Sequence, residues 1–247
     1  NRGQVVGVSY NLPPGGDAPD AEGNGADAAA FLWERGVLTD LGPGEARAIN
    51  HAGDIAGSHN GRAFLFRAGF RIDLGTLGGR MTALSLNECG EVVGSAEDWR
   101  GRPRAFLRNG HGLYDLGTLG GQRSSALGMR ATRVVGWSET ADAQPTRRAF
   151  LYWLAGPLID LNWWLPPGSG WVLQEAVALN PQGEVVGRGL YNGRPAWFLL
   201  RKEAGTPVIE LPVRDGELVS MNNVGQMAGQ AVAAPQGQVR AILLTPR

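Results

Sequence analysis

Five tryptophans are the side chains of this sequence best suited to recognise a ligand. Three are clustered and two stand apart along the chain: Trp163, Trp164, Trp171, Trp99 and Trp137. An indole ring offers a wide apolar face and one N–H donor, so it can stack on a sugar ring or anchor a protein partner. We expect these five to be ligand-binding residues; the alternative is that they cap the core or pack over Pro166 and Pro167.

The titratable side chains form no pattern that catalysis or metal binding requires. The three histidines, His51, His59 and His111, fall in expected turns or loops, and no set of His, Cys, Asp and Glu has zinc spacing. A calcium loop and a Gly-x-Ser-x-Gly nucleophile elbow are missing as well. The lone Cys89 excludes an internal disulfide. The sequence therefore predicts no catalytic residue, no metal and no cofactor.

Some polar residues recur, which favours a structural role for them. The acids Asp40, Asp73, Asp115 and Asp160 are each followed by Leu, and we expect them to accept hydrogen bonds from turn amides. The stretch Gly-Thr-Leu-Gly-Gly occurs at 75–79 and again at 117–121. It lacks the Lys and the following helix that a phosphate-binding loop needs, so we interpret both copies as links between elements.

The elements that position these residues repeat along the chain. A turn followed by a short apolar strand occurs six times and ends at Gly7, Gly57, Gly94, Gly136, Gly187 and Gly229. A second motif, Ala-Phe-Leu at 30–32, returns at 63–65, 105–107 and 149–151 and, in changed form, at 196–199 and 241–244. The interval averages about 44 residues, the length of a four-stranded propeller blade or of a two-helix repeat. Short β-branched and aromatic segments separated by glycine exclude helices.

One unit shows four expected strands, over 82–87, 91–95, 104–108 and 113–116. The first two are joined by an Asn-x-x-Gly turn, in which the Asn side chain can bond the backbone and Gly supplies a positive φ. The turn residues expected across the repeats are Asn50, Gly53, Asn87, Gly90, Asn180, Gly183, Asn222 and Gly225. In the fourth unit Met129 and Thr132 replace them, so we expect a looser turn or one of another type there.

The first strand of each unit alternates small and large residues. Ala83, Ser85 and Asn87 share one expected face, and Leu84 and Leu86 share the other. Sheets that pack both faces on neighbours need such alternation, so the sequence predicts an all-β propeller. We expect six four-stranded blades whose terminal blades are incomplete, one lacking a first strand and the other a fourth. The missing strands would precede Asn1 in a longer chain, and five blades with spare strands is the alternative.

We expect a single propeller domain over 1–247, with blades near 1–44, 45–80, 81–122, 123–171, 172–215 and 216–247. The 23 basic and 23 acidic side chains balance, which argues against nucleic acid or an anionic membrane as partner. No apolar run reaches the roughly 18 residues of a membrane span. The chain begins at Asn1 without Met, from which we expect trimming or processing upstream.

The motifs resemble a known family. Asp73–Gly79 and its copy Asp115–Gly121, with Ala-Phe-Leu and Asn-x-x-Gly-x-Val-Val-Gly, are similar to the HAF-type extracellular repeat of bacterial proteins. The stretches Asp160-Leu-Asn and 165–171 resemble a variant unit of that family, and the resemblance covers 29–244. It implies a β-propeller-like fold, a secreted or surface location and no established activity. Asp40-Leu-Gly-Pro-Gly44 and Glu210-Leu-Pro212 depart from the motif.

The long loops indicate which face binds. In a four-stranded meander, the second-to-third loops and the links between blades share one end, and the expected long segments are 10–28, 96–102, 139–146, 162–170 and 233–238. Binding residues are usually carried by such loops on a rigid scaffold. We therefore expect a non-catalytic binding or assembly module for a glycan or protein ligand.

Two alternatives stay open. The first is a propeller-scaffold enzyme acting on an extracellular polymer; we expect almost no carboxylates on the inner strands, which argues against it. The second is a structural subunit of a surface fibre or coat, self-assembling through the open edges of the terminal blades.

Overall fold

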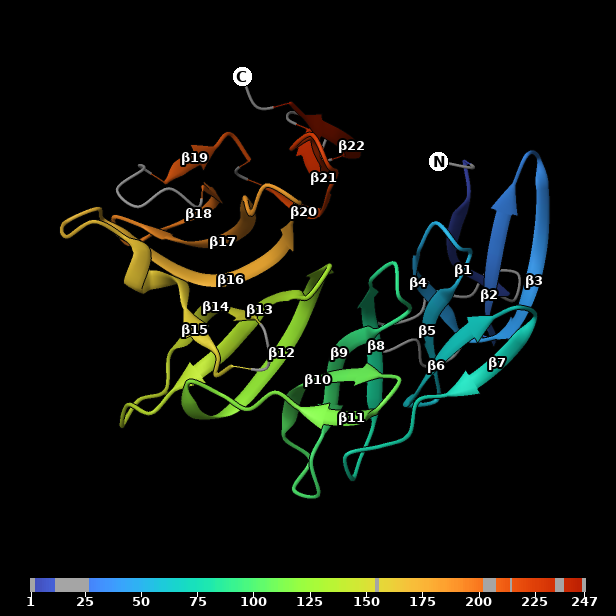
Figure 1. The fold of residues 1–247 in the computed structure, drawn as a ribbon. Coiled ribbons are helices and arrows are strands. Elements are labelled where there is room, and N and C mark those ends of the chain that lie inside the picture. The colour runs from blue at the N-terminus through green and yellow to red at the C-terminus, as the bar shows by residue number, and fades with distance from the viewer. Residues whose placement is uncertain are drawn as a thin grey trace. The chain divides into compact units, whose positions relative to one another are not determined.

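The computed structural model describes residues 3–11, 27–153, 156–201, 208–213, 215–233 and 238–245. Apart from one short 3₁₀ helix, the elements in these ranges are β-strands (Figure 1). The chain divides into two compact units, Asn1–Asp115 and Leu116–Arg247. No helix in the ranges given is long and apolar enough to span a membrane. The expectation of one domain over the whole chain stays a prediction.

The first unit contains three antiparallel sheets whose strands follow one another in chain order. The first sheet has three strands and the next two have four. They are β1 (Val5–Asn11), β2 (Asp27–Glu34) and β3 (Val37–Pro43); β4 (Glu45–Ile49), β5 (Ile55–His59), β6 (Arg62–Arg67) and β7 (Phe70–Asp73); and β8 (Met81–Leu86), β9 (Val92–Glu97), β10 (Pro103–Asn109) and β11 (Gly112–Asp115).

The second unit contains two four-stranded sheets and a final three-stranded one, again in chain order. They are β12 (Gly120–Arg130), β13 (Arg133–Thr140), β14 (Arg147–Trp153) and β15 (Ile159–Asp160); β16 (Trp171–Leu179), β17 (Val185–Tyr191), β18 (Arg194–Leu200) and β19 (Ile209–Leu211); and β20 (Gly216–Met221), β21 (Met227–Ala233) and β22 (Gln238–Leu244). The 3₁₀ helix η1 (Leu161–Trp164) links β15 to β16.

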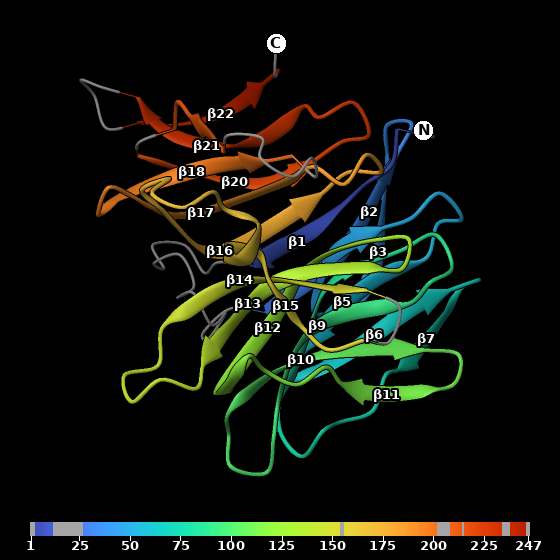
Figure 2. The ribbon, with the colours of Figure 1, turned by 60° about the vertical axis from the view of Figure 1, so that its left-hand side comes forward.

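The six sheets confirm the predicted meander with incomplete terminal blades. The unit predicted at 82–116 is the sheet β8–β11, with strand ends displaced by one or two residues. The five-blade alternative is wrong, because the strands form six separate sheets. Within each unit, the first strand of a sheet packs across the preceding sheet: β4 and β8 in the first unit, β16 and β20 in the second (Figure 1 and Figure 2).

The two sequence motifs pack against each other inside each sheet. The glycine of Val-Val-Gly lies opposite the phenylalanine of Ala-Phe-Leu, as in Gly94↔Phe106 and Gly136↔Phe150. Phe106 and Phe150 are fully buried. A Cβ on Gly94 would lie 2.9 Å from the Phe106 ring and 2.0 Å from the Thr82 carbonyl oxygen. The glycine is therefore required, because the ring and the neighbouring strand occupy the space of a side chain.

The predicted strict alternation on the first strands is wrong. Five of these strands carry a register shift at the same place, for example between Ala83 and Ser85 in β8 and between Ala176 and Ala178 in β16. A bulge sets two residues opposite one, which breaks the two-residue period. In β8 the buried side chains are consequently Met81, Ala83 and Leu86.

The turns between first and second strands are tied by the Asn side chains. Asn87 Oδ1 accepts hydrogen bonds from the amides of Cys89 and Glu91, both at 3.0 Å, and the Gly90 amide donates to the Asn87 carbonyl at 3.0 Å. In the fourth sheet Arg130 pairs with Arg133, so the turn has only two residues, with φ of 49° at Ala131. This turn is of another type, as expected, but it is tight rather than loose.

Candidate functional site

The second unit contains a cavity of about 500 Å³. Its walls come from the start of β14, from β16, β17 and β18, and from the start of β20. This volume lies within the range of small-ligand sites in proteins. The polar or aromatic residues that define its character are Arg147, Gln174, Glu175, Arg188, Trp197 and Glu217.

A second bulge in β16 places two polar residues on the cavity. The register between β16 and β17 shifts between Leu173, which pairs with Gly189, and Glu175, which pairs with Arg188. Bulges re-aim side chains, and here both Gln174 and Glu175 line the cavity. A Cβ on Gly189 would lie 2.1 Å from the Val172 carbonyl oxygen, so the wall has room only for glycine at that position.

Charged groups converge on Glu175, whose side chain is only 13% exposed. Arg188 Nη2 donates to Glu175 Oε2 at 3.1 Å, and Arg147 Nη1 lies 3.9 Å from the same oxygen. The Arg147 guanidinium also lies over the Trp137 ring, 3.9 Å from its centroid. Stacking on an aromatic ring restricts the position of a guanidinium, so the Trp137 ring holds the Arg147 side chain at the cavity wall.

Part of the cavity wall joins two sheets. Trp197 on β18 is buried, and its Nε1–H donates to the Gly216 carbonyl at the start of β20, at 3.0 Å. Glu217, the next residue of β20, is exposed and also lines the cavity. Leu190 and Pro195 add apolar surface. The cavity therefore combines two guanidiniums, two carboxylates, an amide and an apolar wall.

The expectation that the inner strands hold almost no carboxylates is wrong. Glu45, Glu175 and Glu217 occupy one equivalent position, directly before the bulge of β4, β16 and β20. Each of the three lies five residues before the Asn of an Asn-x-x-Gly turn, so an alignment of the repeats on that turn reveals the shared position. In the first unit Glu45 is tied to Arg47 at 2.5 Å and to the Tyr10 hydroxyl at 3.3 Å. In the second unit Glu175 and Glu217 line the same cavity.

The three clustered tryptophans are not exposed together. Trp163 in η1 is 75% exposed, whereas Trp164 packs against a core cluster. Trp171 is 8% exposed; it stacks on Tyr191 at 4.8 Å and meets the edge of Phe198 at 6.1 Å. Trp137 is buried beneath Arg147. The structure thus leaves Trp163 available for contact and connects Trp137 to the cavity through Arg147.

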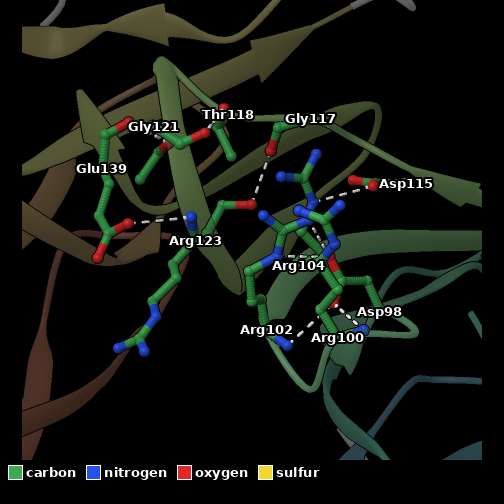
Figure 3. Close-up of polar contacts among 12 residues, drawn as sticks. Asp98, Arg100, Arg102, Arg104, Asp115, Gly117, Thr118, Gly121, Arg123 and Glu139 are labelled. Carbon is green, nitrogen blue, oxygen red and sulfur yellow. Dashed lines mark hydrogen bonds and ion pairs between the residues drawn. The ribbon is translucent and has the colours of Figure 1, made fainter. Parts of the chain in front are cut away.

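In the first unit Trp99 is 74% exposed on the turn between β9 and β10. Asp98 holds this turn: its Oδ1 accepts from the amides of Arg100 and Arg102, and its Oδ2 accepts from Arg102 Nε at 2.8 Å (Figure 3). The hydrogen bond from the Arg102 side chain is the main reason that the pKa of Asp98 is lowered to about 2. The Arg100 guanidinium lies 4.3 Å from the Trp99 ring centroid.

The Gly-Thr-Leu-Gly-Gly stretches use their polar groups internally. Thr118 Oγ1 donates to the Gly121 carbonyl at 2.8 Å, and Glu139 Oε2 accepts from the Arg123 amide at 3.1 Å (Figure 3). In the first unit Thr76 and Gly79 make the same bond at 2.9 Å, and the Arg80 amide donates to Glu97. Each stretch is thus closed by its own threonine, and the amides that directly follow it are bound by a carboxylate of the neighbouring strand, which fits the interpretation as structural links.

The recurring acids bind turn amides, as the sequence predicts. Asp40, Asp73 and Asp160 each accept a hydrogen bond at 2.8 Å from the amide two residues on. In the portion of the chain that the structure covers, no group of three or more His, Cys, Asp or Glu could hold a metal ion. Of the expected long loops, 10–28 and 233–238 fall mostly outside the described residues.

Six antiparallel meander sheets in chain order, together with the likeness to a solved structure, identify the fold as a β-propeller. A solved structure from Agrobacterium tumefaciens, provisionally assigned as TolB, superposes with a TM-score of 0.61 over 98% of this chain and 84% of that chain, at 9% sequence identity. At this identity the likeness establishes the fold alone. No family model matches the sequence, and no curated protein matches it.

Proposed function

We propose that this propeller is a non-catalytic binding module of the bacterial envelope or cell surface. Three points support the proposal: the propeller fold, the resemblance of the sequence motifs to the HAF-type repeat, and the fold likeness to a protein assigned as TolB, which is compatible with an envelope location. The ligand is taken up in the cavity of the second unit. We infer binding rather than turnover, because Glu175, the least exposed acid of the cavity, is held in ion pairs with Arg147 and Arg188.

The observation that carries the proposal is the position of the cavity. Cross-strand pairs place Glu139 beside Arg147, and Tyr191 beside both Trp171 and Arg194. These pairs lie where the β13–β14 loop, the η1 link and the β17–β18 turn meet the sheets. On the cavity wall, Arg147 is the first residue of β14, and Leu190 and Pro195 flank the β17–β18 turn, whereas Arg188 lies in the middle of β17. In this unit the cavity therefore opens toward the end of the strands that carries the long loops, which is the end expected to bind.

The exposed tryptophans extend the proposed binding surface. Trp163 lies on the link that enters β16, the strand that carries Glu175, so a ligand longer than the cavity could continue over it. In the first unit, Trp99 offers an equally exposed ring on a rigid turn. Exposed aromatic rings at the rim of a site are typical contact points for ligands.

The test is an array of bacterial glycans and envelope peptides probed with the full chain. Arg147→Glu reverses a charge at the cavity, and Arg194→Glu reverses one on β18 outside it, so the second variant is a matched control. We expect Arg147→Glu to weaken binding of the recognised ligand about tenfold or more and Arg194→Glu to leave it unchanged. Equal binding by both variants and the unaltered chain would remove the cavity as the site.

An enzyme acting on an extracellular polymer is the second candidate, and one observation favours it. Glu175 and Glu217 line the same cavity, and paired carboxylates can serve as acid and base in polymer cleavage. Release of reducing ends from a bacterial polysaccharide, abolished by Glu217→Gln, would support this candidate. Absence of any release, together with binding on the array, would support the binding module.

A further inference from the structure

Several hydrogen-bonding groups in the cavity are not used by the protein. Both arginine contacts of Glu175 go to Oε2. Among the described residues, Glu175 Oε1, the side-chain amide of Gln174 and the carboxylate of Glu217 have no hydrogen-bond partner. Arg147 makes only its long ion pair and its contact with Trp137 in the same part of the chain. The cavity thus offers donors and acceptors together.

The formal charges of the cavity cancel. Two guanidiniums, of Arg147 and Arg188, face two carboxylates, of Glu175 and Glu217. An anionic ligand would gain from the arginines but be repelled by the carboxylates, and a cationic ligand would meet the reverse. Because a charged ligand would also lose its hydration on entry, the cavity favours a ligand that is polar without net charge.

The donor and acceptor groups suit hydroxyls. A hydroxyl donates one hydrogen bond and accepts two, so one such group can donate to Glu175 Oε1 while it accepts from Arg147 or Gln174. Leu190, Pro195 and the buried Trp197, which pairs with Arg188 across the strands, supply apolar surface in the same cavity. A sugar ring has this combination, because its hydroxyls lie around an apolar C–H face.

We propose that the cavity of the second unit binds a neutral saccharide, with its hydroxyls on Glu175, Gln174, Arg147 and Glu217. The inference rests on the proposed binding function and names its ligand class. The volume of about 500 Å³ suits a short segment of a glycan rather than a single small ion. Glu175 is the central group for two reasons. Its side chain is only 13% exposed, and its Oε2 is bound by arginines while its Oε1 is not used by any described residue.

The test is calorimetric titration of the full chain with three sets of disaccharides. The neutral set is maltose, cellobiose and diacetylchitobiose; the anionic set carries a uronic acid; the cationic set carries free amino sugars. We expect at least one neutral disaccharide to bind and its charged analogues to bind about tenfold more weakly. Tighter binding of the anionic or of the cationic set would overturn the proposal.

Variants locate the binding. Glu217→Gln and Glu175→Gln keep the shape of the side chain and remove a charge-assisted acceptor, so each should weaken the neutral ligand about tenfold or more. Glu217 is exposed, so its variant keeps the test valid if Glu175→Gln fails to fold. Glu210→Gln on β19 is the matched control, because Glu210 is exposed and is not part of the cavity wall.

The two proposals fail in different ways. Unchanged neutral binding in both cavity variants would overturn the saccharide assignment. Failure of all three disaccharide sets, with array binding to a peptide that Arg147→Glu abolishes, would remove the saccharide and leave the binding module intact. Loss of the binding module itself would be seen as no binding of the unaltered chain to any glycan or peptide on the array.

Discussion

Arg67 on β6 holds Asp54 at the start of β5 through two parallel hydrogen bonds, Nε to Oδ1 at 2.9 Å and Nη2 to Oδ2 at 2.7 Å. The same arginine reaches the Cys89 carbonyl of the next sheet at 3.2 Å. Asn50 donates to Asp54 at 2.9 Å and to the Asn87 carbonyl at 3.1 Å. The turns of two successive sheets are therefore joined by one buried carboxylate.

We predict that Asp54→Asn destabilises the protein by about 1–3 kcal/mol at neutral pH, because Arg67 and Asn50 lose a charged acceptor. Asp73→Asn is the control: its partner Arg62 is 65% exposed, so the effect should stay below about 1 kcal/mol. Urea unfolding of the three proteins measures both. Equal stabilities of the two variants would contradict a special role for Asp54.

The Asp54 pair should also make stability depend on pH. The hydrogen bond from Arg67 is the main cause that lowers the pKa of Asp54. A carboxyl whose pKa is depressed on folding stabilises the protein above its unfolded pKa, about 3.9, and that contribution is lost as pH falls through the folded pKa. We expect the stability difference between the unaltered chain and Asp54→Asn to shrink below about pH 4. A difference that stays constant with pH would refute this account.

The turn that carries Trp99 should keep its structure at acidic pH. Because Arg102 and two amides bind Asp98, the pKa of Asp98 is about 2, and the contribution of its ionised form is lost only as pH falls from the ordinary value through about 2. Carboxyl NMR titration would measure this value. In Arg102→Gln the pKa should rise toward the ordinary value, while Arg71→Gln, which alters a side chain distant in sequence, should leave it in place.

We predict that Gly94→Ala strongly destabilises the first unit. The added methyl would overlap the Thr82 carbonyl oxygen and the Phe106 ring, and overpacking of this kind costs about 1–3 kcal/mol or more. Gly110→Ala is the matched control, since no heavy atom lies within 4 Å of its Cβ position. Thermal unfolding distinguishes them. An unchanged unfolding temperature for Gly94→Ala would show that β8 and β10 can move to accommodate the methyl group at no cost in stability.

The tryptophans should divide by their burial. Trp171→Ala removes a ring packed on Tyr191 and Phe198 and should cost about 3–5 kcal/mol. Trp163→Ala removes a ring that is 75% exposed and should change stability by less than about 0.5 kcal/mol. Denaturant unfolding gives both values. Similar losses for the two variants would mean that Trp163 has a structural role and is not free to contact a ligand.

Much of the fold could be predicted from the sequence because its signals are local. The Asn-x-x-Gly turns and the Ala-Phe-Leu strands are each complete within a few residues, so their repetition indicated six sheets of short antiparallel strands. The contact between Gly94 and Phe106 links two such motifs, and only the pairing of strands reveals it.

The site could not be predicted because bulges place it. An extra residue before Glu175 shifts its pairing by one, and this sets which side chains line the cavity. Residue type gives no sign of such a shift. The burial of the tryptophans could not be predicted from the sequence either. Trp163 and Trp171 are close in sequence, yet Trp163 lies in the 3₁₀ helix at the surface, whereas Trp171 is the buried first residue of β16.

The contact between glycine and phenylalanine recurs in sheet after sheet, and each copy is made within its own sheet. Five of the six sheets thereby carry their own means of keeping their strands in register; in the sixth, Gly229 lies opposite Ile242. Insertions and deletions in the connecting segments leave that contact untouched, so evolution can vary recognition surfaces in one copy of the repeat without having to re-engineer its neighbours.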